Sequence, residues 1–268
     1  MDFNKVIIMT DLDGTLLTDD KRILDKDMAA IERFRAGGGI FTMATGRGYS
    51  MARSVADKLR LNSPAVLFNG AAVYDFGSDK FLWRCEIGEQ AVAIINRVAE
   101  RFPDIGVEVL REHAVFVPFL NETEQWHMDL ERVDADKRPL SEIPLDGWLK
   151  VLFAYPPEKM DGLVEFIEND PAFRGVQWVR SAPMFYECLP EGIDKAEGYR
   201  QLIRVIGAED RFTVAAGDFM NDTHMIQNAD LGAAVASAQP SVKAAADIIV
   251  CDNNSGAISE IIDYIERL

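Results

Sequence analysis

Near its N-terminus the chain reads Val6-Ile7-Ile8-Met9-Thr10-Asp11-Leu12-Asp13-Gly14-Thr15. Residues 6–9 form a short apolar run rich in β-branched side chains, which indicates a strand buried on both faces. Asp11 and Asp13 lie two positions apart, so an extended chain would carry both carboxylates on one side. Such a pair repels itself and loses hydration, and a divalent cation would relieve both costs. An ordinary polar turn is the alternative, because Asp and Gly are common in turns.

The composition is that of a globular protein that can bury a sizeable core. The chain has 268 residues, of which 48% are hydrophobic and 27% charged. This length allows one large domain or two ordinary ones. The net charge is −16 and no cluster of Lys or Arg is present. A nucleic-acid partner is therefore not expected, since such proteins present a basic face.

The termini and cysteines indicate a cytoplasmic protein with no membrane partner. An acid at position 2 and an apolar run of four residues make neither a signal peptide nor a membrane span. Cys85, Cys188 and Cys251 are far apart and form no C-x-x-C pair. Such cysteines are typical of small buried side chains in a reducing compartment. The sequence indicates no particular oligomeric state.

The first part of the chain alternates between strands and helices. Residues 39–44 and 65–68 form two further apolar runs, with helical patterns at 25–36 and 49–59 between the strands. This alternation predicts an α/β fold with a doubly wound parallel sheet. Residues 72–74 and 81–84, joined through a Gly-Ser-Asp turn, predict a hairpin.

The pattern changes between residues 85 and 189, where paired strands separated by helices predict a distinct α+β domain. The expected helices cover 89–102 and 157–168, and the expected strands cover 107–110, 115–119, 148–155, 176–180 and 184–189. The polar residues 131–144 are expected to be a connection. After residue 190 the doubly wound pattern returns, with strands at 212–216, 231–235 and 248–251. We therefore expect a core of residues 1–84 and 190–268 that carries residues 85–189 as an insertion.

Four polar segments share one structural address, the carboxyl end of a buried strand or the start of the next helix. They are Asp11/Asp13, Thr45-Gly46, Lys195, and Asp218 with Asn221-Asp222. Each alone has an ordinary explanation as a helix cap or a solvated side chain. Ligands of open parallel sheets bind at this edge, so the convergence of carboxylates, a hydroxyl and an ammonium there favours a binding site.

This mixture of groups suits a phosphoryl group. Mg²⁺ held by Asp11, Asp218 and the main-chain carbonyl of Asp13 would cancel the repulsion between a phosphate and an attacking carboxylate. Thr45 and a helix N-terminus can donate hydrogen bonds to phosphate oxygens. Lys195 supplies a compact positive charge.

The same segments resemble the four motifs of the haloacid dehalogenase (HAD) superfamily of phosphohydrolases. The matching residues are Asp11-Leu12-Asp13-Gly14-Thr15, Thr45-Gly46-Arg47, Lys195, and Gly217-Asp218-Phe219-Met220-Asn221-Asp222. The α+β insertion between the second and third motifs resembles a type C2B cap, which indicates the Cof-type sugar-phosphatase branch with its Rossmann-like core. The resemblance covers nearly the whole chain, although the insertion matches in layout more than in residues.

The resemblance implies a role for each matching residue. Asp11 matches the nucleophile that forms an aspartyl-phosphate, and Asp13 matches the general acid and base. The positions implied to bind phosphate are Leu12, Thr45, Gly46, Arg47, Lys195 and Asn221, and those implied to form the metal site are Asp11, Asp13, Asp218 and Asp222. The implied function is a Mg²⁺-dependent phosphatase that hydrolyses small phosphorylated metabolites, in particular sugar phosphates.

The chain departs from the branch at three positions, where Phe219, Ser237 and Glu197 replace the usual residue types. Two other functions use similar groups. A phosphomutase or phosphotransferase would use the same aspartyl-phosphate, and a phospho-accepting signalling module would also combine Asp, Thr, Lys and Mg²⁺. Signalling receivers are much shorter and lack an inserted domain, which argues against the second.

The remaining histidines and tryptophans are expected outside the site. His113, His127 and His224 have no Cys or His neighbours at metal-binding spacing, so structural or surface positions are expected. Trp83, Trp126, Trp148 and Trp178 are expected in the core.

Overall fold

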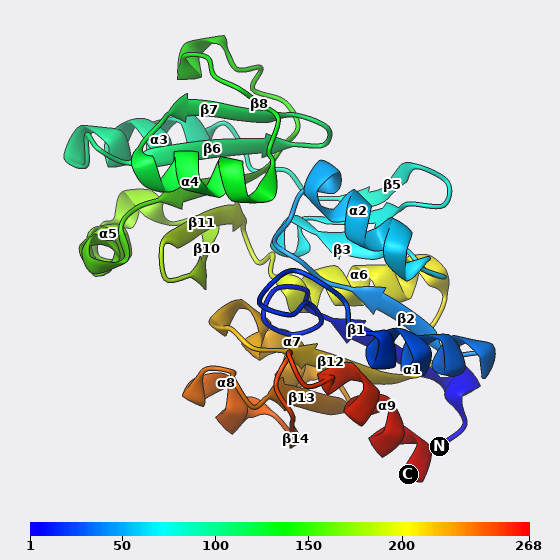
Figure 1. Ribbon diagram of the computed structural model, residues 1–268. Coiled ribbons are helices and arrows are strands. Elements are labelled where there is room, and N and C mark those ends of the chain that lie inside the picture. The colour runs from blue at the N-terminus through cyan, green and yellow to red at the C-terminus, as the bar shows by residue number, and fades with distance from the viewer.

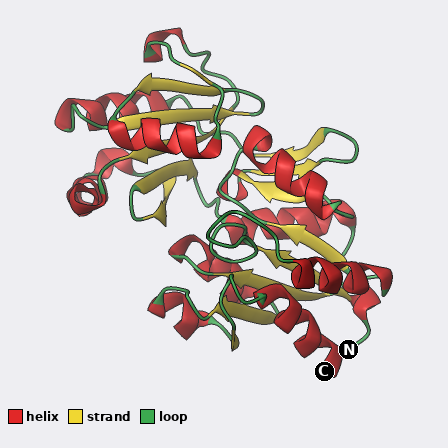
Figure 2. Ribbon diagram, in the orientation of Figure 1, coloured by secondary structure: helices red, strands yellow, loops and turns green.

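A computed structural model describes residues 1–268, and two separate sheets dominate it (Figure 1). One sheet has five strands and lies near both termini, and the other has six strands and comes from the middle of the chain. We call residues 90–190 the inserted lobe and the remainder the core lobe. Helices pack around the sheet of each lobe (Figure 2). None of the helices combines the length and the apolar composition that crossing a lipid bilayer requires.

The central sheet of the core lobe is entirely parallel. Its strands, in spatial order, are β14 (Ile248–Val250), β13 (Leu231–Val235), β12 (Phe212–Gly217), β1 (Val6–Thr10) and β2 (Ile40–Met43). In the middle of the sheet, Thr10 of β1 is in register with Ala216 of β12 and Met43 of β2. The predicted doubly wound parallel fold is therefore confirmed, and the residues after these three strands meet at one edge.

Alternate residues of β1 face opposite sides of the sheet. Val6 and Ile8 join an apolar cluster with Ile31 of α1 (Asp25–Ala36) and Ile261 of α9 (Ala257–Arg267). Ile7 and Met9 face the other side and join a second cluster with residues of α6 (Lys195–Ile206) and α7 (Thr223–Asn228). This explains the continuous apolar run, because helices cover both faces. The helices of the core lobe are α1 (Asp25–Ala36), α2 (Tyr49–Leu59), α6 (Lys195–Ile206), α7 (Thr223–Asn228), α8 (Pro240–Ala245) and α9 (Ala257–Arg267).

The third predicted strand does not continue the central sheet. β3 (Ala65–Leu67) instead pairs antiparallel with β4 (Ala72–Asp75), and β4 pairs with β5 (Lys80–Arg84) as the predicted hairpin. Beside the central sheet, β3 pairs in parallel through a single bridge between Ala44, just beyond β2, and Val66. β2 ends at Met43, and the main-chain amide of Thr45 just beyond it donates to the carbonyl of Val66 at 3.0 Å, so β3 adjoins this edge of the central sheet while its regular ladder is with β4.

The inserted lobe has its own core. Its strands are β6 (Gly106–Arg111), β7 (Val115–Phe119), β8 (Ala135–Asp136), β9 (Trp148–Ala154), β10 (Val176–Ala182) and β11 (Phe185–Pro190), in the order β10-β11-β9-β6-β7-β8. All pairs except β7–β8 are antiparallel. Its helices are α3 (Gln90–Arg101), α4 (Glu122–Glu131) and α5 (Pro157–Asn169). The apolar cluster of this lobe contains the fully buried Ile95, Val98 and Phe153.

Apolar periodicity does not predict α4, because the buried face of this helix is largely polar. Glu124 and His127 are buried, whereas Trp126 and Leu130 are 49% and 50% exposed. The helix begins after an N-cap, Asn121, whose side-chain oxygen accepts a hydrogen bond from the amide of Glu124 at 2.7 Å. This Asn is the one local signal in the sequence for the start of the helix.

Gly70 is a position where the core lobe tolerates no side chain. Its φ is +109°, and a Cβ there would lie 1.9 Å from the carbonyl oxygen of Asp194. Gly70→Ala should therefore lower the free energy of unfolding by about 2–4 kcal/mol. The control is Gly162→Ala within α5, where nothing lies within 4 Å; this change should stabilise the protein by about 0.5–1 kcal/mol. Thermal unfolding followed by circular dichroism measures both, and a Gly70→Ala protein that melts with the wild type contradicts the packing described.

Candidate active site

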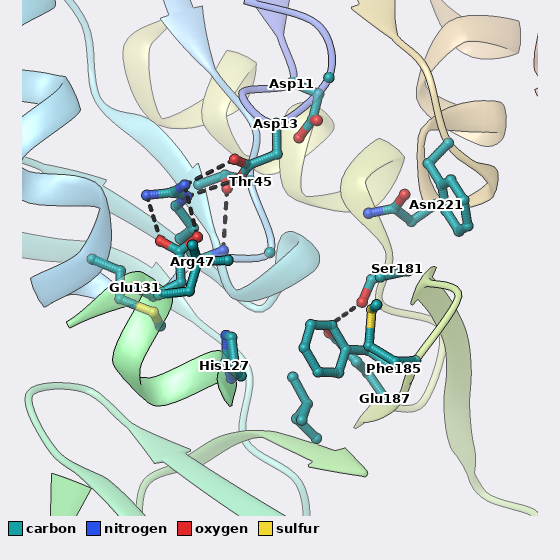
Figure 3. Close-up of a pocket in the computed structure, with 18 of the residues that line it drawn as sticks. Asp11, Asp13, Thr45, Arg47, His127, Glu131, Ser181, Phe185, Glu187 and Asn221 are labelled. Atoms are coloured by element: carbon teal, nitrogen blue, oxygen red, sulfur yellow. Dashed lines mark hydrogen bonds and ion pairs between the residues drawn. The ribbon is translucent and has the colours of Figure 1, made fainter. Parts of the chain in front are cut away.

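A cavity of about 360 Å³ lies between the carboxyl edge of the central sheet and the inserted lobe. Asp11 and Asp13 lie on the core side of this cavity, and His127, Phe185 and Glu187 lie on the side of the inserted lobe (Figure 3). The predicted site residues that line it are Asp11, Asp13, Thr45, Gly46, Arg47, Asp218 and Asn221. Its size suits a small metabolite.

Lys195, the first residue of α6, is buried beneath the cavity between two carboxylates. Its Nζ atom lies 2.6 Å from Asp11 Oδ1 and 2.6 Å from Asp222 Oδ1. Only 1% of Lys195 is exposed. Burial raises the pKa of Asp11 well above its ordinary range, although Lys195 opposes this. These two carboxylates engage two of the three donors of the ammonium.

Asp222 supports the neighbouring loop rather than facing the cavity. Its Oδ2 accepts hydrogen bonds from the amides of Asp218, at 3.0 Å, and Phe219, at 3.1 Å. Both of its oxygens are therefore occupied, and its side chain is fully buried. Gly217 permits this close approach, because a Cβ there would lie 2.4 Å from Asp222.

Asp218 retains an oxygen that is free to bind a cation. Its Oδ1 accepts a hydrogen bond from the Thr15 hydroxyl at 2.9 Å, and its Oδ2 accepts none. Ligand atoms of Asp11, Asp218 and Asp222 all lie within 4.8 Å of one another. Burial and the charge of Asp222 raise the pKa of Asp218 to about 7. These crowded hard oxygen donors could hold a divalent metal ion, which would remove the repulsion between them.

Asp13 is held in ion pairs. Arg47 contacts it through Nε–Oδ2 at 2.9 Å and Nη2–Oδ1 at 2.8 Å, and Lys21 Nζ lies 2.5 Å from Oδ1 (Figure 3 draws the Arg47 contacts). Burial alone would raise the pKa of Asp13, but the two cations hold it at about 2. Arg47 also pairs with Glu131 of α4 at 2.9 Å. One guanidinium thus connects Asp13 to the inserted lobe.

The remaining predicted phosphate-binding groups lie around this arrangement. Thr45 Oγ1 accepts a hydrogen bond from the Arg47 amide at 3.1 Å, so its own proton stays available. Asn221 Nδ2 donates to Asn69 Oδ1 at 3.0 Å. The side chain of Leu12 is fully buried, so only its main chain can face a ligand.

The three departures from the motif pattern leave these groups intact. Phe219 contributes its main-chain amide to Asp222, which any side chain allows. The side chain of Glu197 pairs with Arg200 and accepts a hydrogen bond from Gln201 on the same helix, and it forms no ion pair with Lys195. Ser237 is exposed and lies outside the cavity lining.

Several polar residues of the inserted lobe, not predicted from the sequence, also line the cavity. Lys150 of β9 donates to the carbonyl of Gly46 at 2.7 Å and pairs with Glu187 of β11 at 3.1 Å. Glu187 also accepts a hydrogen bond from Asn69 Nδ2 at 2.6 Å. The sequence signal that could have indicated these residues is the presence of one Lys in β9 and one Glu in β11, two strands that are otherwise mostly apolar. Trp126 lines the cavity rim and is 49% exposed, so its prediction as a core residue was wrong.

Comparison with known proteins identifies the class. The sequence profile of the haloacid dehalogenase-like hydrolases matches residues 8–262, and the chain belongs to this family. The putative phosphatase YxeH of Bacillus subtilis is 26% identical over 96% of each chain. The 5-amino-6-(5-phospho-D-ribitylamino)uracil phosphatase YcsE of Bacillus subtilis is 26% identical over 96% of this chain and 94% of the relative.

The fold is also similar to solved structures of the family. The crystal structure of a haloacid dehalogenase-like hydrolase from Bacteroides thetaiotaomicron superposes with a TM-score of 0.81 at 26% identity, covering 97% of this chain and 98% of the other. The resemblance inferred from the four motifs is therefore confirmed at the level of the family and of the fold.

The two carboxylates Asp218 and Asp13 should influence stability with opposite signs. The pKa of Asp218 is raised to about 7. In protein without metal, the free energy of unfolding is therefore unaffected by this carboxyl below about pH 4 and falls as the pH rises from there to 7, because the folded state resists the ionisation of Asp218. Asp218→Asn should therefore stabilise the metal-free protein at pH 8, on the order of 1–3 kcal/mol, and much less near pH 4. Melting temperatures measured in EDTA across this pH range test the difference.

Asp13→Asn is the matched control. The pKa of Asp13 is lowered to about 2, so the stabilisation that ionised Asp13 gives the folded state is present above pH 4 and is lost as the pH falls toward 2. Its removal should destabilise the protein at neutral pH. If the difference in melting temperature between Asp218→Asn and the wild type is the same at every pH, the charge crowding described for the site is contradicted.

Proposed function

We propose that this protein is a Mg²⁺-dependent phosphatase that hydrolyses small phosphate monoesters through an aspartyl-phosphate at Asp11. The observation that carries the proposal is the buried Lys195, which pairs with Asp11 at 2.6 Å directly below the cavity. Such an ammonium has one free donor for a phosphate oxygen and keeps the attacking carboxylate in a fixed position. Membership of a hydrolase family, and relatives named as phosphatases, support the same activity.

The phosphate group would be bound by donors that the fold already orients. Thr45 would donate its free hydroxyl proton, Lys195 its third ammonium proton, and Arg47 a charged fork. The main chain of Leu12 and Gly46 would line the same site, and Asn221 would orient the phosphate from the opposite side. These groups neutralise the charge that otherwise repels a carboxylate nucleophile.

The metal site would consist of Asp11, Asp218 and the carbonyl of Asp13, with Asp222 supporting the loop from behind. A bound Mg²⁺ would supply charge neutralisation for the phosphate and the nucleophile. Binding there should also lower the raised pKa of Asp11 and Asp218, because a cation stabilises the ionised carboxylates.

The chemistry would proceed in two steps. An oxygen of Asp11 attacks phosphorus, and the leaving oxygen departs with a proton from Asp13, leaving phosphate attached to Asp11. Asp13 then takes a proton from the water that attacks the phosphorus and releases Asp11 and phosphate. The acid role requires a protonated Asp13, whereas Arg47 and Lys21 hold it ionised in this structure. We therefore propose that the incoming phosphate draws Arg47 away from Asp13 before the first step.

Residues 85–189 would act as a cap that selects the leaving group, with residues 1–84 and 190–268 as the catalytic core. The core residues at the cavity would be committed to phosphate and metal. The opposite wall consists of residues of the inserted lobe, including Trp126, Lys150 and Phe185. A leaving group would contact this wall, so the preference for one sugar or alcohol over another should depend on it.

Metal dependence tests the proposed function. With p-nitrophenyl phosphate as substrate, EDTA should abolish turnover and Mg²⁺ should restore it. Ca²⁺ should restore much less, because its larger and more flexible coordination shell misplaces the nucleophile. Repeated turnover also separates a phosphatase from a receiver, which is phosphorylated once. The assay measures nitrophenolate release per enzyme.

Asp11→Asn is the control for contaminating phosphatases. The amide is nearly isosteric with the carboxylate but is a poor nucleophile and a weaker metal ligand, so turnover should fall by about a thousandfold or more. Full activity of the wild type in excess chelator, or near-normal activity of a verified Asp11→Asn preparation, would overturn the proposal.

A further inference from the structure

A second cluster of potential ligands lies in the inserted lobe and takes no part in the chemistry proposed above. It consists of Glu108 on β6 and Glu124 and His127 on α4. Both carboxylates are fully buried, and His127 is 8% exposed. Ligand atoms of the three residues all lie within 4.8 Å of one another.

The polar atoms of this cluster have no hydrogen-bond partners. Both carboxylate oxygens of Glu108, both of Glu124 and Nδ1 of His127 are buried and unpaired. His127 Nδ1 lies 3.5 Å from Glu108 Oε2 and 3.7 Å from Glu124 Oε1, which is too far for good hydrogen bonds. Apart from these two long ion pairs, the five buried atoms make no hydrogen bond, which is costly because buried polar groups in folded proteins almost always have hydrogen-bond partners. A group that satisfies all three residues at once would remove this cost.

The separations match the spacing of ligands around a metal ion. Zinc bonds to His nitrogen and carboxylate oxygen are about 2.0–2.2 Å long. At angles between tetrahedral and trigonal, two such ligands lie about 3.3–3.8 Å apart. The two measured separations, 3.5 and 3.7 Å, fall in this range. We propose that Glu108, Glu124 and His127 bind a divalent first-row transition ion such as zinc.

The ligand set separates this site from the Mg²⁺ site of the core lobe. An imidazole with two carboxylates suits zinc and similar ions, whereas the core site offers oxygen donors alone. Three protein ligands leave a coordination position open. Glu108 and His127 line the cavity, so the open position lies toward the space that a leaving group would occupy (Figure 3 shows His127 on this wall).

The local fold brings these three ligands together. Glu124 and His127 are three residues apart on α4, so they share one face of the helix. Gly106 lets that face approach the sheet, because a Cβ there would lie 2.8 Å from Glu124 Cβ. The ammonium of Lys150 is paired with Glu187, so the imidazole of His127 is the one basic group that forms an ion pair with Glu108. An ion here would fasten α4, and with it Glu131, to the sheet of the inserted lobe.

Zinc binding to the full-length protein tests the site directly. Chelator-stripped protein would be dialysed against Zn²⁺ in the presence of excess Mg²⁺, which occupies the core site, and bound zinc would be counted by inductively coupled plasma mass spectrometry. The wild type should retain one zinc per chain. X-ray absorption of this zinc should show nitrogen and oxygen neighbours and no sulfur, which excludes the cysteines as ligands.

Substitutions assign the bound ion to this cluster. Glu108→Gln and Glu124→Gln keep the side-chain shape, and each should weaken zinc binding at least tenfold, with circular dichroism as the check of folding. Asp218→Asn, in the core site, should retain the zinc. The proposal is overturned if the wild type holds no zinc, in which case an imidazolium shared between two carboxylates accounts for the cluster. It is also overturned if zinc is unaffected by both glutamine variants or is lost in Asp218→Asn.

Discussion

The structure depends on the contact between one buried ammonium and two carboxylates at the edge of the central sheet. Lys195 lies between Asp11 and Asp222, 2.6 Å from each. Without Lys195, these two carboxylates would be buried side by side with no cation between them. Removing one partner of a buried ion pair typically lowers the free energy of unfolding by roughly 3–5 kcal/mol. Lys195 forms ion pairs with Asp11 and Asp222 and offsets the charge of Asp218 only in part, so burial and Asp222 still raise the pKa of Asp218 to about 7. The site therefore carries an excess of negative charge, which a divalent cation would neutralise.

A second charged contact joins the catalytic edge to the inserted lobe. Arg47 pairs with Asp13 on one side and with Glu131 of α4 on the other. A guanidinium that leaves Asp13 for a phosphate would also change its contact with α4. Phosphate binding and the position of the inserted lobe would thus be coupled, because both would use the same side chain. Such coupling would prepare Asp13 for proton transfer only when a substrate is present.

The sequence was sufficient to predict which residues meet at the carboxyl edge of the central sheet. It was insufficient to predict the cavity wall that the inserted lobe provides. Asp11, Thr45 and Asp218 follow adjacent parallel strands, and the carboxyl ends of such strands necessarily meet, so their convergence could be predicted. α4 could not be predicted, because it buries Glu124 and His127 and exposes Trp126, the reverse of the usual apolar pattern. Lys150 and Glu187 lie on different strands, and only the register of β9 and β11 brings them together. The strand predicted at 65–68 is present as β3, but its antiparallel ladder with β4, beside the parallel bridge to the central sheet, could not be predicted because pairing partners are not encoded locally.

The central claim is that phosphate is transferred to Asp11 before it reaches water, and the pre-steady-state behaviour of Asp13→Asn tests this most directly. With p-nitrophenyl phosphate and Mg²⁺, the first step needs no acid because nitrophenolate is a stable leaving group, whereas the second step lacks its base. The variant should release one equivalent of nitrophenolate per enzyme in a burst and then slow down, with phosphate found on the peptide that contains Asp11. A folded, Mg²⁺-bound Asp13→Asn protein with neither a burst nor a phosphorylated Asp11 peptide would contradict the covalent mechanism.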